Sequence, residues 1–432
     1  MGFFSNLFSS IGTNQTAPTF NLGNSGNTVG NSGSTVGNLS FMNSLTGFTQ
    51  SSSAGNSSSS PITPTPAAYA PTGGWLGAVD DAGAPQTDSK DVFDQAGNVL
   101  KLGAKDEKGS GGEGTVYEFP QNGRILVKIY KDDILKDARK MGDLRRRITD
   151  MVNLETCAKM PFLAWPLMPA MNSRKEIIGF AMRKCSGFSF LTLRGPRFIK
   201  QRFPGWTRRH LALTALDFVK KAKLLAANNV LINDFNPANF YVNDKCEVSF
   251  IDCDSYQVPS SPHGVNITRT FFPSHVAPEL LRNKRLLDAP RTIRQVEFGV
   301  ALTVFNILMC GLHPYNFCDA SHKSACGTPD ENLLKGRCPL GTGSDCFLPK
   351  GGWYNLWSWL TFDLKSTFIK MFKDGHANLS VRPSLDDLQR GIEQLLIEMK
   401  RTPERMDMEP MKPKPATRNS PSGARLHAVD VF

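Results

Sequence analysis

Three oxygen-bearing side chains lie close together in the middle of the chain. Asp234 and Asn239 stand at the start of one short apolar run, and Asp252 follows a second. The runs, 239–242 and 248–251, flank a polar turn, which predicts a β-hairpin. At such strand ends one carboxylate can accept a hydroxyl proton, while the other carboxylate and the amide hold Mg²⁺ on a nucleotide. An ordinary hairpin with polar turns is the alternative, because this Asp–Asn spacing is common by chance.

A glycine-rich stretch lies upstream of these residues. Gly109, Gly111 and Gly114 match Gly-x-Gly-x-x-Gly, with Gly112 inside the motif and Val116 just after it. The following residues favour a strand, whereas the dinucleotide-binding version of the motif requires a helix. Glycines let a strand–turn–strand close over phosphates. On its own the match is weak, since any glycine-rich hairpin can produce it.

A lysine follows the glycines at a position that suits phosphate binding. A turn at 121–123 leads into the apolar run 125–130, and Lys128 lies in that run, 14 residues after Gly114. We expect Lys128 to point inward and neutralise phosphates. The alternative is a surface lysine on an amphipathic strand.

The combination resembles eukaryotic-like protein kinases. The elements follow one another in the same order as in a kinase, over about three hundred residues. The most similar branch is a bacterial group of Ser/Thr kinases with Gly-Gly-Glu-Gly, Asp-x-Asn-Pro-x-Asn and Ile-Asp-x-Asp-Ser motifs, all of which this chain contains. The resemblance implies an α+β, two-lobed fold with a small antiparallel-sheet N-lobe and a mainly helical C-lobe. It also implies protein substrates, and association with a PP2C-type phosphatase and a von Willebrand A-type protein.

The resemblance further implies roles for single residues. Asp234 matches the catalytic base, Asn239 and Asp252 match ligands of Mg²⁺ or Mn²⁺, and Lys128 with the glycine loop matches the group that holds the ATP phosphates. The adenine-side hinge would follow the strand 177–181. Its residues would be Met182 and Cys185.

The end of a kinase activation segment is also matched. Ala277, Pro278 and Glu279 correspond to its closing Ala-Pro-Glu. Arg382 is the expected partner of Glu279.

Several positions depart from the kinase pattern. Asn233 replaces the arginine before the base, and Asn236 replaces the usual lysine two residues after it. The Asp-Phe-Gly motif reads Asp252-Cys253-Asp254. A kinase also needs an acid on the helix expected at 134–151 to pair with Lys128. No Glu occurs there, which leaves Asp137 and Asp143 as candidates.

Composition suggests four segments. Residues 1–91 are poor in charge and rich in Ser, Gly and Asn, which predicts a disordered arm. We expect the N-lobe at 92–185 and the C-lobe at 186–399, with a cysteine-containing insertion at 314–352. A flexible tail should follow at 400–432.

The remaining features limit the class of protein. The net charge of +11 favours acidic partners, and we expect no specific nucleic-acid binding. No signal peptide or membrane-spanning run is apparent, so we expect a cytoplasmic protein, although the helical spacing of apolar residues in 1–11 permits a weak membrane contact. A zinc site in the insertion is conceivable, but its spacings lack close Cys pairs and scattered thiols are favoured. Its possible ligands are Cys318, His322, Cys326, Cys338 and Cys346.

The sequence thus predicts an ATP- and Mg²⁺-dependent Ser/Thr protein kinase. Two rivals use the same fold. A pseudokinase would bind nucleotide without turnover, and the missing lysine and unclear helix acid favour it. A transferase of another kind would move AMP or act on a small molecule.

Overall fold

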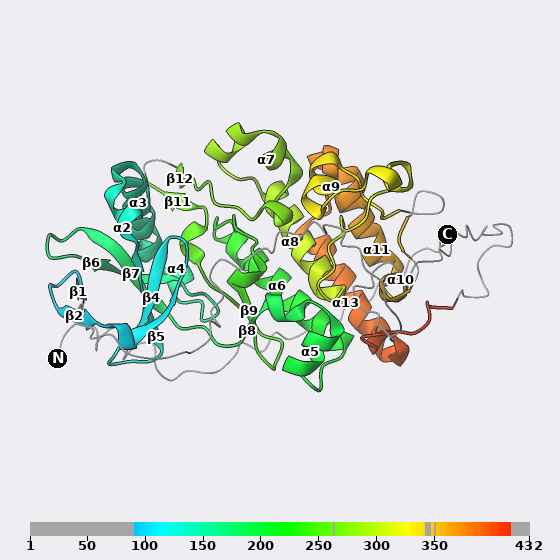
Figure 1. Ribbon diagram of the computed structural model, residues 1–432, viewed down its shortest axis with the longest axis horizontal. Coiled ribbons are helices and arrows are strands. Elements are labelled where there is room, and N and C mark those ends of the chain that lie inside the picture. Colours follow the sequence, from blue (N-terminus) through cyan, green and yellow to red (C-terminus); the bar gives the residue numbers. More distant parts are fainter. Residues whose placement is uncertain (1–89, 262–263, 342–346, 350, 416–432) are drawn as a thin grey trace, which may run out of the picture.

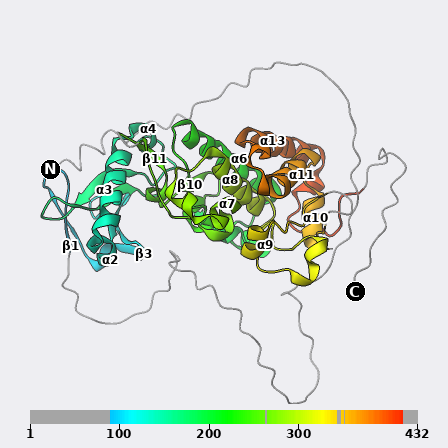
Figure 2. The ribbon, with the colours of Figure 1, turned by 90° about the horizontal axis from the view of Figure 1, so that it is seen from above.

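The described residues form two lobes that lie end to end along the long axis of the molecule (Figure 1, Figure 2). Residues 1–89 of the expected disordered arm, which include the stretch 1–11, lie outside the described residues. No helix in the described part of the chain is long and apolar enough to cross a membrane. The computed structural model describes residues 90–261, 264–341, 347–349 and 351–415.

The first lobe is built on a seven-stranded antiparallel sheet in the order β2-β1-β6-β7-β5-β4-β3. Buried apolar side chains form a cluster on each face of this sheet. Its strands are β1 (Lys90–Phe93), β2 (Val99–Leu102), β3 (Glu107–Ser110), β4 (Gly114–Glu118), β5 (Ile125–Tyr130), β6 (Pro166–Met171) and β7 (Ile177–Arg183).

The strands on either side of β5 approach it closely near Lys128. A Cβ atom added at Gly114 of β4 would lie 2.8 Å from the Ile129 carbonyl oxygen. A Cβ at Gly179 of β7 would overlap the Lys128 carbonyl oxygen. Both neighbouring strands therefore need glycine opposite the end of β5, at the residues that pair with Tyr130 and Ile129.

One helix, α3 (Ala138–Asn153), packs against β6 and β7. The sequence predicts a single helix over 134–151, but the structure has a break before α3. A short α2 (Asp132–Lys136) ends there, and the Asp137 side chain caps α3 by accepting a hydrogen bond from the Lys140 backbone N–H at 3.0 Å. An N-capping aspartate favours a helix start at this point over an uninterrupted helix.

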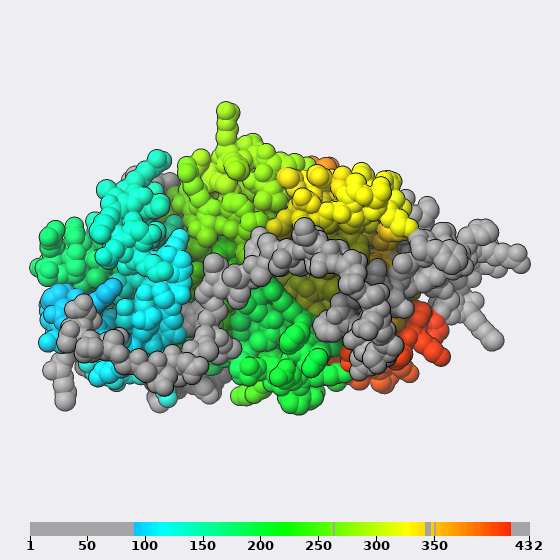
Figure 3. Space-filling model, viewed as in Figure 1, coloured from blue at the N-terminus to red at the C-terminus, as the bar shows by residue number. Residues whose placement is uncertain are grey.

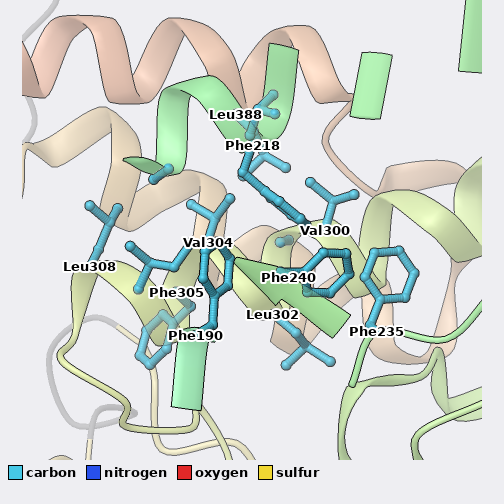
Figure 4. Close-up of a cluster of buried hydrophobic side chains, with 14 of the residues drawn as sticks. Phe190, Phe218, Phe235, Phe240, Val300, Leu302, Val304, Phe305, Leu308 and Leu388 are labelled. Carbon is cyan, nitrogen blue, oxygen red and sulfur yellow. The ribbon is translucent and has the colours of Figure 1, made fainter. Parts of the chain in front are cut away.

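The second lobe is mainly helical, and its core is a large cluster of buried side chains. Figure 4 shows Phe218 and Phe240 packed with Val300, Val304 and Phe305 at its centre. Helix α4 (Glu155–Ala158) lies between α3 and β6 in the chain, and the helices of the second lobe are α5 (Pro196–Arg202), α6 (Arg208–Ala227), α7 (Pro278–Arg282), α8 (Ile293–Leu308), α9 (Pro329–Lys335), α10 (Gly352–Ser358), α11 (Phe362–Ile369), α12 (Gly375–Ala377) and α13 (Leu385–Arg401).

This lobe also holds short strands: β8 (Phe188–Ser189), β9 (Phe240–Val242), β10 (Val248–Phe250), β11 (Val258–Ser260) and β12 (Gly264–Asn266). In the space-filling view, the blue and cyan side chains of the sheet lobe meet green segments of the helical lobe (Figure 3). A small antiparallel-sheet lobe joined to a mainly helical lobe is the two-lobed, protein-kinase-like fold expected from the sequence.

The helical lobe continues past Met399, the end expected from the sequence. Met408 is buried, and the Asn355 side chain donates to the Pro410 carbonyl oxygen at 2.7 Å. Trp359 donates its indole N–H to the Lys412 carbonyl oxygen at 3.0 Å. Residues 402–415 therefore pack on α10 and its C-terminal end, and the expectation of a flexible tail from residue 400 is wrong for this part.

Candidate active site

The predicted hairpin brings two candidate ligands together. Strands β9 and β10 pair in antiparallel register, with Phe240 opposite Phe250. Beyond this pair, the Ile251 backbone N–H donates to the Asn239 carbonyl oxygen at 2.9 Å. Asn239 and Asp252 therefore flank the end of one hairpin, as the sequence predicts.

The loop that carries Asp234 is held from both sides. Leu231 and Gln257 exchange backbone hydrogen bonds of 2.9 Å, which ties the loop to the segment after Asp252. The Phe235 ring packs against Gly299 of α8 so closely that a Cβ there would overlap it. This packing leaves Asp234 little freedom to move.

Asp234 is a buried carboxylate with two hydrogen-bond donors. Its Oδ1 accepts from the Asn236 backbone N–H at 3.1 Å, and its Oδ2 accepts from Asn239 Nδ2 at 3.0 Å. Burial raises its pKa to about 6, the Asn236 hydrogen bond opposes the shift, and the negative charge of Asp252 adds to it. A carboxylate with a pKa this close to neutrality is suited to accept a proton.

Asp252 adopts a left-handed backbone conformation, with φ of 55°. This conformation is uncommon for a residue other than glycine and is found at functional sites. Its side chain is 41% exposed, and Oδ1 accepts from Lys128 Nζ at 2.6 Å. Burial of the site raises the pKa of Asp252, and Lys128 opposes this shift.

Lys128 is buried, as predicted, but its acidic partner does not come from the helix. Asp137 is half-buried at the start of α3, and Asp143 is exposed and pairs with Arg146 at 2.7 Å. Both candidates are therefore wrong. The partner is Asp254, whose Oδ1 and Oδ2 accept from Lys128 Nζ at 3.0 and 2.9 Å.

Asp254 is one of the most buried charged groups in the site, at 2% exposure. Its Oδ2 also accepts from the Tyr130 hydroxyl at 2.7 Å. Burial alone would raise the pKa of Asp254, but Lys128 and the Tyr130 hydrogen bond outweigh it and the pKa is lowered. Burial alone would likewise lower the pKa of Lys128, but Asp252 and Asp254 raise it. Lys128 therefore stays protonated, and its partner comes from the segment after Asp252, not from the helix where a kinase acid is expected.

The glycine motif forms the turn between β3 and β4. Gly109 pairs with Val116, and the Gly111 backbone N–H donates to the Gly114 carbonyl oxygen at 2.8 Å. Gly112 has open space where a Cβ would stand. Glu113 completes this turn, and burial and the negative charge of Asp254 raise its pKa. An acidic side chain of the glycine loop thus lies within electrostatic reach of the Lys128 site.

The residues expected around adenine belong to one apolar cluster. Val116 and Met182 are buried in it, and the half-buried Cys185 and Ile251 pack against it. Met182 lies opposite Leu126 of β5 in the sheet. The cluster therefore extends from the sheet to the residue that precedes Asp252.

The predicted pair of Glu279 and Arg382 is present. Arg382 Nη1 and Nη2 donate to the two carboxylate oxygens of Glu279 at 2.9 and 2.7 Å. The Arg382 side chain is fully buried. This bidentate pair fixes the end of the activation segment to the helical lobe.

The described thiols of the cysteine-containing insertion make local contacts. Cys318 donates to the His322 carbonyl oxygen at 3.2 Å, and Cys338 is buried. Cys346 lies outside the described residues. Within the described ranges, no group of three or more His, Cys, Asp or Glu side chains is placed to hold a metal ion.

The donor set at the end of the hairpin fits a magnesium ion that also binds phosphate. Mg²⁺ is commonly held by one or two protein oxygen ligands together with phosphates and water. The half-exposed carboxylate of Asp252 and the amide of Asn239 offer oxygen atoms of this kind, and they flank one turn of chain.

Comparisons with known proteins find protein kinases among the relatives of this chain. The chain is 26% identical to "Protein kinase YegI" of Escherichia coli strain K12 over 227 residues, which cover 52% of this chain and 34% of the relative. The relative of the same name from Escherichia coli O157:H7 is 26% identical over 212 residues, covering 49% and 32%. The chain therefore spans about a third of the length of the curated relatives it matches. No family model matches it.

A solved structure, the ROP18 kinase domain in complex with AMP-PNP and sucrose, aligns with a TM-score of 0.45 at 14% identity. The alignment covers 74% of this chain and 88% of that chain. By its lobes and its matched relatives, the protein is protein-kinase-like.

Proposed function

We propose that this protein is an ATP-dependent Ser/Thr protein kinase that transfers the γ-phosphoryl group to protein hydroxyls. The observation that carries the proposal is the placement of Asp234, Asn239 and Asp252 around one hairpin end, with Lys128 2.6 Å from Asp252. These are the groups that phosphoryl transfer needs: an acceptor for the hydroxyl proton, oxygen ligands for Mg²⁺ and a cation for phosphates.

Each residue has a separate role in this proposal. Asp234 orients the substrate hydroxyl and accepts its proton. Asn239 and Asp252 hold Mg²⁺ or Mn²⁺, which when bound neutralises phosphate charge. Lys128 positions the phosphates, and the turn that carries the motif glycines covers them. These glycines are Gly109, Gly111, Gly112 and Gly114.

The adenine base would lie against the apolar cluster that contains Val116, Met182 and Cys185. Ser/Thr specificity, a cytoplasmic location and association with a PP2C-type phosphatase and a von Willebrand A-type protein rest on the sequence resemblance. They remain predictions.

A nucleotide-binding pseudokinase is the second candidate. Asn236 donates its backbone N–H to Asp234 at 3.1 Å. It replaces the usual kinase lysine, and its side chain has no positive charge to stabilise a transferred phosphoryl group. Lys128 also has both Asp252 and Asp254 as acceptors. A pseudokinase would use the same site for Mg-nucleotide without turnover.

The test is incubation with Mg-ATP and a generic protein substrate, followed by mass spectrometry of the products. The proposal expects a phosphoryl group on Ser or Thr, and its loss in Asp252→Asn. An added AMP group would instead identify the other transferase. Nucleotide binding without any modified product would favour the pseudokinase.

A further inference from the structure

Lys128 has a second acidic partner, Asp254, which is separate from the metal-ligand candidate Asp252. An ammonium group has three N–H donors. In the structure one donor meets Asp252, which is half-exposed, and the others meet Asp254, which is buried. The Tyr130 hydroxyl holds Asp254 from β5, the strand that also carries Lys128.

The helix beside this site presents a cation to it. The buried face of α3 consists of four apolar residues and Arg147. Arg147 is 8% exposed, and its Nε has no hydrogen-bond partner among the described residues. Helix α3 contacts residues 253–255, and Arg147 on its buried face is therefore near Asp254.

We propose that the usual arrangement, in which an acid on the helix pairs with the lysine, is exchanged in this protein: Asp254 of the metal loop (252–254) holds Lys128, and Arg147 of α3 supports Asp254. Asp254 and Arg147 are then positioning residues for the phosphate-binding lysine. The proposal rests on the function proposed above.

The charges of the site explain why both residues are needed. Asp252 and Asp254 together outnumber Lys128 by one negative charge, which would repel a triphosphate. Arg147 offsets one of the negative charges that Asp252, Asp254 and the nearby Glu113 bring to the site. When Asp252 serves as a metal ligand, Asp254 keeps its two hydrogen bonds to Lys128, and the third N–H is available to a phosphate oxygen.

Helix α3 is held in place by other contacts. Ser260 Oγ and Asn266 Nδ2 donate to Asp150 Oδ2 at 2.7 and 2.6 Å, and Arg146 Nε donates to Asn266 Oδ1 at 3.2 Å. These contacts join α3 to the β11–β12 hairpin. The Lys128 ion pair is therefore formed within β5 and the metal loop, and it does not require α3 to move inward.

The test compares Asp254→Asn, Asp254→Gly and Arg147→Glu with the double variant Asp254→Gly/Arg147→Glu. Asp143→Asn is the matched control, because Asp143 is an exposed acid on the same helix. We measure kcat and KM for Mg-ATP, and Mg-ADP affinity by calorimetry. Circular dichroism checks folding, and Arg147→Lys keeps the charge if Arg147→Glu does not fold.

Loss of charged hydrogen bonds worth about 1.5–3 kcal/mol should lower kcat/KM of Asp254→Asn by about 10- to 100-fold. The control should stay within about threefold of the wild type, a change of under 1 kcal/mol. The double variant should recover about tenfold over Asp254→Gly, a non-additivity typical of residues in one network, because a glutamate in place of Arg147 recreates a helix acid for Lys128.

A purely structural role predicts no such recovery. Equal activity of Asp254→Asn and Asp143→Asn in an active enzyme, or a double variant no better than Asp254→Gly, overturns the inference and leaves the proposed function standing. A wild type that binds Mg-ADP but transfers nothing refutes the kinase function. The Mg-ADP affinities of the same variants then test whether Asp254 and Arg147 position Lys128. A wild type that binds no Mg-nucleotide refutes both.

Discussion

The Asp234→Asn variant should be more stable than the wild type at neutral pH, because folding buries an ionised carboxylate at this position. Burial raises the pKa of Asp234 from 3.8 to about 6. One pKa unit corresponds to about 1.36 kcal/mol, so above pH 6 the ionised group lowers the free energy of unfolding by about 3 kcal/mol. Between the two pKa values the folded protein binds a proton that the unfolded chain has released, and stability falls as pH rises.

Asparagine removes this charge but keeps only part of the hydrogen bonding. Asp234 accepts from the Asn236 N–H and from Asn239 Nδ2, and loss of one such bond costs about 1 kcal/mol. The variant should therefore gain about 2 kcal/mol at pH 7.5 and close to nothing at pH 4.5. The difference between the two pH values does not depend on the hydrogen-bond loss.

Urea unfolding in EDTA at both pH values, followed by tryptophan fluorescence, measures this difference without bound metal. The exposed Asp143→Asn variant serves as control and should show no pH-dependent gain. An unchanged stability difference between wild type and Asp234→Asn at the two pH values would refute the reasoning. Asp234 would then have an ordinary pKa, and its assignment as base would lose its electrostatic support.

Three further predictions follow from the site and its surroundings. Glu279→Gln should lower the free energy of unfolding by about 3–5 kcal/mol in urea titrations, since it leaves the Arg382 charge buried without its partner; a loss below about 1 kcal/mol would contradict the importance of the pair. Glu113→Gln should lower the KM for Mg-ATP by about two- to fivefold, because it removes a partly screened like charge near the phosphates; an unchanged or higher KM would show that Glu113 does not face them. Single removal of the hydroxyls in 255–270 should leave phosphoryl transfer largely intact in a kinase assay, because Asn233 has no charge to hold a phosphorylated loop; collapse of activity that an acidic replacement restores would refute this.

The sequence was most informative where chemistry and local structure coincide. Asp234, Asn239 and Asp252 lie around one hairpin because short apolar runs and a polar turn determine it locally. The bidentate pair of Glu279 and Arg382 could be found because both ends match a motif.

The sequence was least informative about the partner of Lys128. Asp254 looked like a simple departure from the kinase motif, since a local pattern does not show which side chains meet across two lobes. The absence of Glu on the helix, an added acid after Asp252 and the basic Arg147 together carried the signal. Packing of residues 402–415 on α10 was missed for a similar reason, because apart from the buried Met408 the contacts include backbone carbonyl groups that any sequence supplies.

The most direct test of the proposed mechanism compares Asp234→Asn and Asp252→Asn with the wild type for Mg-ATP affinity and for transfer of labelled phosphate to a generic protein. The mechanism predicts that Asp234→Asn keeps nucleotide affinity and loses about 10²–10⁴-fold in transfer rate. Asp252→Asn should lose Mg²⁺-dependent affinity as well as transfer. Unchanged transfer by Asp234→Asn, while Asp252→Asn is inactive, would contradict the assignment of Asp234 as the base.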